Sequence, residues 1–70
     1  IEGMFMNSTS LNTIDLSTFK FENINTNNLF MNINNESTIY VKSSVEQAWI
    51  FGSNNTNRPE NWKAKNVLVK

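Results

Sequence analysis

The strongest constraint on the fold is an internal repeat with a period of about 25 residues. When the 70-residue chain is compared with itself at this shift, residues 4–7 (Met-Phe-Met-Asn) align with residues 29–32 (Leu-Phe-Met-Asn). At the same shift, residues 13–16 (Thr-Ile-Asp-Leu) align with residues 38–41 (Thr-Ile-Tyr-Val). Five of these eight positions are identical, and two more exchange one apolar side chain for another. A period of this length is typical of solenoid proteins, in which each unit forms one turn and stacks on its neighbours.

Each unit is predicted to contain one short strand. Ile14 and Leu16 alternate with polar neighbours, the spacing of a strand that buries one face, and Leu11 is expected to pack inward just before it. Residues 38–41 are rich in β-branched side chains, which favour strands. Because both segments occupy the same place in successive units, we predict that they pair in parallel.

The segment between the two strands is harder to interpret. Ile24 followed by Leu29-Phe30-Met31 has a spacing that a short helix over residues 23–31 would explain. Four Asn and one Thr among those nine residues disfavour a helix. A helix over residues 23–31 is nevertheless expected from the spacing of its apolar residues.

The repeat ends after Lys42, and residues 43–70 are predicted to form a mixed C-terminal cap. Ser43 or Ser44 can cap a helix, and Glu46 lies three residues after Ser43, as in a capping box. Gly52 is a plausible end of this helix, and the composition of residues 52–61 predicts a loop. The remaining expectations for this part are a last strand over residues 67–69 and a hydrophobic cap formed by two tryptophans, Trp49 and Trp62.

Composition excludes several classes of protein. With no Cys and no His, the chain has neither a disulfide nor the usual zinc ligands, and we expect no metal and no other cofactor. Six basic and six acidic residues balance, which argues against a nucleic-acid partner. No stretch approaches the roughly 20 apolar residues of a membrane-spanning helix, and no signal peptide is evident. The start at Ile1 suggests a segment of a longer protein.

Asparagine is the most unusual feature of the composition, at fourteen of the 70 residues. Asn favours turns and tolerates the left-handed backbone conformation, so its abundance suits a fold with many sharp corners. Codon usage in an AT-rich genome explains the same count equally well.

The motif Met-Phe-x-Asn at residues 4–7, followed by Leu-x-x-Ile-Asp-Leu-Ser at residues 11–17, resembles the repeat of the BspA-like leucine-rich-repeat proteins, a bacterial surface family with units of about 25 residues. The resemblance extends from Ile1 to about Val41. The second unit has Asn35-Glu36 in place of the Ser-Leu step, as in a degenerate last repeat. The resemblance implies an extracellular, cell-surface location and adhesion to host or matrix proteins.

The fold class we predict is α/β: a short solenoid of leucine-rich-repeat type with one parallel strand per repeat. Residues 1–42 are interpreted as two degenerate repeats, and residues 43–70 as the cap that ends the array. Two repeats are fewer than the roughly three such arrays need for stability. We therefore expect exposed apolar surface at the N-terminal end, which preceding repeats of the same chain or another copy would cover.

A non-catalytic role is favoured, because the six acidic residues are scattered and lack a partnering His or Cys. The leading hypothesis is protein binding through the outward side chains of the strands. Alternatives are a structural cap without a ligand and a carbohydrate-binding module that uses exposed tryptophans. The candidate binding residues, offered as a protein-binding strand face, are Thr13, Asp15, Thr38 and Tyr40.

Overall fold

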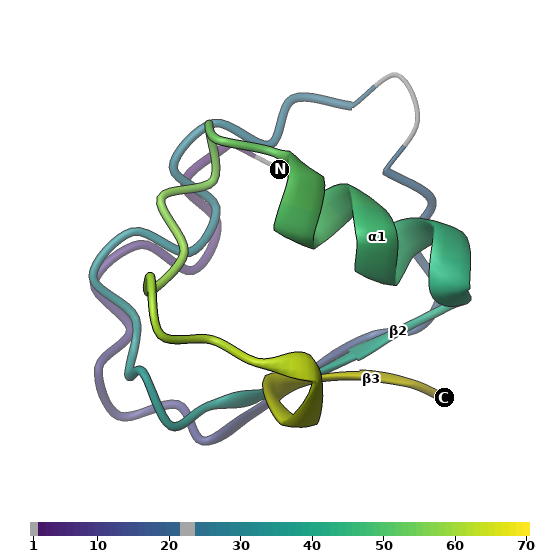
Figure 1. Ribbon diagram of the computed structural model, residues 1–70. Coiled ribbons are helices and arrows are strands. Elements are labelled where there is room, and N and C mark those ends of the chain that lie inside the picture. Colours follow the sequence, from purple (N-terminus) through teal and green to yellow (C-terminus); the bar gives the residue numbers. More distant parts are fainter. Residues whose placement is uncertain (1, 22–23) are drawn as a thin grey trace.

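Three short strands form a parallel sheet along one side of the molecule. The computed structural model describes residues 2–21 and 24–70. The strands are β1 (Thr13–Leu16), β2 (Thr38–Val41) and β3 (Val67–Val69), and they lie side by side in chain order (Figure 1). β1 pairs with β2 in the register of the repeat, since Thr13 lies opposite Thr38 and so on to the end of both strands. The offset between paired residues is therefore the repeat period itself.

The chain also stacks on itself at the side away from the sheet. Amides in one turn donate hydrogen bonds to carbonyls in the next turn at 2.8, 3.2 and 2.8 Å, in the pairs Gly3 to Asn27, Phe5 to Leu29 and Asn7 to Met31. The second turn is joined to the following segment in the same way, from Asn28 to Asn55 and from Phe30 to Thr56. Figure 1 shows these turns nearly superimposed at the side opposite the C-terminus. Successive segments of the chain thus form stacked coils.

Asparagine forms the corners of these coils. Asn28 and Asn32 have positive φ values of 58°, and so have their counterparts one repeat earlier, Gly3 and Asn7, at 60° and 64°. A left-handed residue costs most L side chains about 1–2 kcal/mol, and Gly and Asn are the exceptions. Side-chain amides also bridge the coils, for example from Asn32 Nδ2 to Asn7 Oδ1 at 2.9 Å. Part of the Asn content therefore has a structural explanation.

The helix expected over residues 23–31 is not observed in the described part of that range, residues 24–31, and Asn23 lies outside the described residues. Consecutive turns occupy the segment instead, with amides bonding to carbonyls three residues earlier, as from Leu29 to Thr26 and from Met31 to Asn28. The left-handed backbone at Asn28 interrupts any regular helix. The spacing of the apolar residues in this segment therefore reflects tight turns, which bury Leu29 and Phe30, and not a helix.

One core runs through the coils and beneath the cap. The inward side chains of the strands pack against the corner residues and the cap, and the buried apolar set comprises Ile14, Leu16, Phe21, Leu29, Phe30, Ile33, Ile39, Val41, Ile50, Trp62 and Val67. Two aromatic pairs connect the cap to the coils with ring centroids 5.1 Å apart, Phe21 with Trp49 and Phe30 with Trp62. The tryptophans therefore join cap and coils in one hydrophobic unit.

Helix α1 (Ser44–Gly52) follows β2 and changes the path of the third coil. Ser43 caps it by accepting from the Val45 amide at 3.2 Å, and the Ser43 hydroxyl donates to the Glu46 carboxylate. In Figure 1 the helix crosses within the outline of the coils and does not follow their edge. Gln47 Nε2 on this helix donates to the carbonyl of Val67 in β3 at 2.6 Å. The offset between β2 and β3 is consequently longer than one repeat unit, with Ile39 opposite Val67.

A short 3₁₀ helix, η1 (Ala64–Asn66), precedes β3 and was not predicted. It is anchored by Asn66, whose Oδ1 accepts from the Lys63 amide at 3.0 Å and whose Nδ2 donates to the Ser37 carbonyl at 3.1 Å. The side chain of Asn66 is buried, so both groups need these partners. This asparagine therefore sets the point at which the third strand enters the sheet.

Replacing Asn28 provides a test of the corner conformation. Asn28→Ala is expected to lower the free energy of unfolding by about 2 kcal/mol, because it adds left-handed strain and removes the acceptor for Asn57 Nδ2. Asn28→Gly removes the same acceptor without the strain, and about 1 kcal/mol is expected. Urea unfolding followed by circular dichroism measures both. Equal losses in the two variants would contradict the left-handed corner.

Candidate binding surfaces

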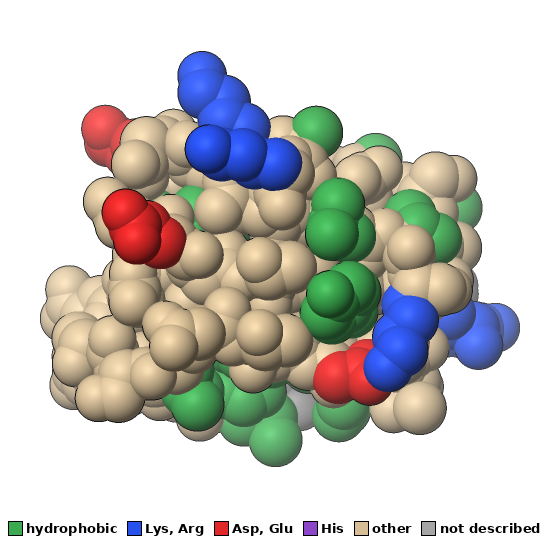
Figure 2. Space-filling view, turned by 90° about the horizontal axis from the view of Figure 1, so that it is seen from below, with side chains coloured by type: hydrophobic (Ala, Val, Ile, Leu, Met, Phe, Trp, Pro, Cys, Tyr) green, Lys and Arg blue, Asp and Glu red, His purple; other side chains and the backbone are tan. Residues whose placement is uncertain are grey.

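The outer face of the sheet brings together all four residues proposed as a binding face. Asp15 lies opposite Tyr40 and Thr13 opposite Thr38, with the two β1 residues exposed and the two β2 residues half-buried. Figure 2 views this side of the molecule: polar side chains and backbone cover much of it, and hydrophobic side chains lie near an acidic and a basic group in contact. Leu68 extends the same row, because it lies opposite Tyr40 and is exposed. Leu68 was missed because the third strand departs from the repeat period.

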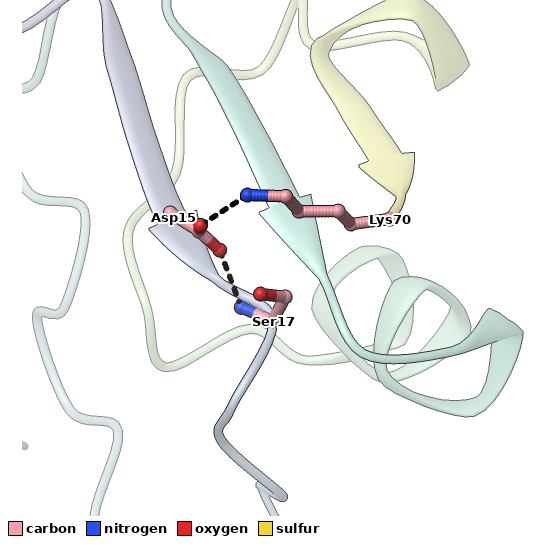
Figure 3. A network of polar contacts seen from close by, with 3 residues as sticks. All are labelled: Asp15, Ser17 and Lys70. Carbon is pink, nitrogen blue, oxygen red and sulfur yellow. Dashed lines mark hydrogen bonds and ion pairs between the residues drawn. The ribbon is translucent and has the colours of Figure 1, made fainter.

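A lysine from the end of the chain crosses this face. Lys70 Nζ lies 2.5 Å from Asp15 Oδ2 and 5.6 Å from the centre of the Tyr40 ring (Figure 3). The other carboxylate oxygen of Asp15 accepts from the Ser17 amide at 2.9 Å. Lys70 is not among the four residues that the sequence placed on this face. A ligand that uses this carboxylate would therefore compete with Lys70 for it.

The ion pair shifts the titration of both groups. Lys70, and after it Ser17, hold the pKa of Asp15 well below its ordinary value near 3.8, and Asp15 raises the pKa of Lys70 above its ordinary value near 10.5. Since the folded pKa of Asp15 is depressed, its contribution to stability is complete above the unfolded pKa and is lost as the pH falls through the folded value. The folded pKa of Lys70 is raised. The contribution of Lys70 to stability is therefore complete below its ordinary pKa near 10.5 and is lost as the pH rises through the folded pKa.

These directions predict the behaviour of a single variant. In an NMR titration of the Asp15 carboxyl carbon, Lys70→Met should return the midpoint toward the ordinary value, because it removes the largest cause of the shift. Lys65→Met removes the same charge from an exposed position that is not bonded to Asp15, and it should leave the midpoint unchanged. A midpoint that does not move in Lys70→Met would show that the crossing lysine does not contact Asp15 in solution.

The first coil leaves apolar side chains exposed, and the clearest contrast with the second coil is at Met4. Met4 is 54% exposed, whereas Leu29, its counterpart one repeat later, is 0% exposed. Met6 and Leu11 are also exposed, so the expectation that Leu11 packs inward is wrong. The expectation of exposed apolar surface at the N-terminal end is confirmed, and its residues define the first-coil edge: Met4, Met6 and Leu11.

The opposite edge of the sheet has a different character. β3 has three residues and is preceded by Lys63 and Lys65. Short edge strands with lysines nearby discourage the pairing of further strands. Leu68 and Val69 remain exposed there. The two edges therefore differ: the first-coil edge is apolar, and the β3 edge is short and flanked by positive charge.

The tryptophans offer little flat surface to a sugar. Trp62 is 5% exposed and packs on Phe30, so the interpretation of both tryptophans as exposed stacking platforms is wrong for this residue. Its ring was needed to close the core, which leaves it no free face. Trp49 is half-buried against Phe21. Only Trp49 can present part of its ring to solvent.

Within residues 2–21 and 24–70, no three side chains of the types His, Cys, Asp and Glu come close enough together to hold a metal ion. No helix in that part of the chain is both long and apolar enough to cross a membrane.

Comparison with known proteins adds no relative. No family model, no curated protein and no solved structure matches this chain.

Proposed function

We propose that this chain is the C-terminal end of a leucine-rich-repeat array of the BspA-like type, a non-catalytic module that binds protein through the outer face of its sheet. The observation that carries the proposal is the pairing of β1 with β2 at an offset of one repeat, together with the coil-to-coil hydrogen bonds behind them. One strand per turn, aligned with the sequence period, is how repeat arrays build a continuous surface.

The contrast between the two edges supports placement at the end of an array. An apolar first-coil edge suits a preceding coil of the same kind, which would cover Met4 as the first coil covers Leu29. Short β3 with its neighbouring lysines suits the last strand of the sheet. An extracellular address at a bacterial surface and adhesion to host or matrix proteins follow from the family resemblance and belong to the same proposal.

Binding through the outer face is tested with the four residues of that face. The combined variant Thr13→Ala, Asp15→Asn, Thr38→Ala, Tyr40→Ser should lose at least about tenfold in retention on a basement-membrane matrix coating, because a few central residues dominate an interface. Each side chain points outward, so circular dichroism should show a folded chain. A matched control changes exposed residues elsewhere: Thr9→Ala, Thr18→Ala and Glu60→Gln. Equal retention of both variants would refute adhesion through this face.

A structural cap without a ligand is the second candidate, and Lys70 favours it. The lysine already occupies the carboxylate of Asp15 and covers part of Tyr40. If the outer face has no ligand and the pair of Lys70 with Asp15 serves only stability, the unmodified chain should show no binding. The combined variant, which lacks this pair, should then be less stable at neutral pH.

A further inference from the structure

We propose that a hollow beside the start of α1 binds an acidic peptide segment that inserts one apolar side chain. This basic–aromatic hollow has a volume of about 510 Å³ and is lined by Lys20, Phe21, Lys42, Val45 and Trp49. Its volume lies within the range of about 300–1,000 Å³ that ligand sites occupy. It shares no residue with the outer face of the sheet, so this inference is independent of the proposed function.

The apolar part of the hollow comes from three side chains. Phe21 and Trp49 form its aromatic wall, with ring centroids 5.1 Å apart and planes tilted by 60°. Phe21 is buried and Trp49 is half-buried, so the wall is part of the packed core. Val45, on the first turn of α1, is 71% exposed. An apolar side chain placed here would cover Val45 and the accessible part of Trp49.

The charged part of the hollow comes from lysines on two different coils. Lys20 follows the first strand and Lys42 follows the second, and both are exposed. Neither makes an ion pair with any residue in the described ranges, where the single salt bridge is that of Lys70. Glu46 also borders the hollow, but it is 8% exposed and accepts the Ser43 hydroxyl at the helix start. Among the described residues that line the hollow, the accessible charge is therefore positive.

The apolar wall and the two lysines together favour one class of ligand. Carboxylates on either side of a leucine-like residue pair with the lysines while the apolar side chain contacts Val45 and Trp49. A neutral sugar would use the ring of Trp49 but not the two lysines. A nucleic-acid backbone would pair with the lysines but would leave the apolar wall uncovered, and two cations are few for a chain of phosphates. An acidic peptide uses both parts.

The test uses the 70-residue chain and the peptide acetyl-Glu-Asp-Leu-Asp-Glu-amide, titrated in an NMR experiment at low salt. Shifts are expected at the Trp49 indole and the Val45 methyl groups. The double variant Lys20→Gln, Lys42→Gln should weaken binding about fivefold, a modest factor because exposed ion pairs contribute little each. A double variant with the same loss of charge elsewhere is Lys63→Gln, Lys65→Gln. It should leave the affinity within about twofold, because salt screens the attraction between the peptide and distant charges.

Two further arms separate the charge from the apolar contact. The peptide with Gln and Asn in place of its acids should bind about fivefold more weakly, and about 0.5 M salt should reduce binding of the acidic peptide through screening. Val45→Thr, which keeps the shape of an exposed side chain, should weaken the acidic peptide about threefold because apolar contact is lost. Equal losses in the two lysine variants, equal affinity of the neutral peptide, or the absence of shifts at Trp49 would each overturn the proposal.

Discussion

Leu29→Ala should lower the free energy of unfolding by about 2–5 kcal/mol, whereas Met4→Ala should lower it by less than about 1 kcal/mol. The two residues occupy the same position in successive coils, yet Leu29 is 0% exposed and Met4 is 54% exposed. Truncation of Leu29 leaves a cavity between the first coil and the cap, while truncation of Met4 removes atoms that already contact water. Urea unfolding monitored by tryptophan fluorescence measures the difference.

This pair of variants isolates burial from residue type. Met and Leu have similar volumes and helix preferences, and neither position lies in a helix or strand. Leu29→Met serves as the control, since volume-conserving exchanges in a core cost less than about 1.5 kcal/mol. Similar losses for Leu29→Ala and Met4→Ala would mean that the two coils are equally covered in solution. Measurements at several protein concentrations exclude self-association through the first-coil edge as the cause.

The positions of β1 and β2 and their parallel pairing could be predicted because two independent signals coincide. The alternation at Ile14 and Leu16 indicates a strand, and the repeat period indicates which strand lies beside it. The helix start at Ser43 was equally accessible, because its capping chemistry is local. Local patterns and repeats are visible in a single sequence, and these elements depend on nothing else.

The remaining features depend on contacts between distant residues. The longer offset of β3 follows from the way α1 takes up chain length and from the anchoring of Asn66 to Ser37, neither of which leaves a pattern in the sequence. The contact of Lys70 with Asp15 joins residues 55 positions apart. Four candidate residues on the outer face were identified by alternation alone, but the lysine that crosses them was not. Sequence alternation shows which way a strand residue points, and only the fold shows what else reaches it.

Adding a further unit before the chain should raise its stability. A second copy of residues 1–25, placed directly before Ile1, keeps the repeat period and provides a coil to cover the first-coil edge of the original chain. The free energy of unfolding is expected to increase by about 2 kcal/mol or more, since burying even one Met or Leu side chain contributes about 1.5–3 kcal/mol. In a repeat array, each interface between neighbours adds to stability in this way. Urea unfolding compares the 70-residue chain with the extended one.

The decisive comparison repeats Met4→Ala in the extended chain. If the added coil stacks as the second coil stacks on the first, the original Met4 becomes buried and its truncation now costs about 2–4 kcal/mol, close to the cost of Leu29→Ala. A scrambled extension of the same length and composition is the control and should leave the cost of Met4→Ala below about 1 kcal/mol. A cost that stays the same in the original, scrambled and extended chains would show that the first-coil edge does not receive another coil. The placement of this chain at the end of a repeat array would then fail, because that placement requires the edge to be an interface.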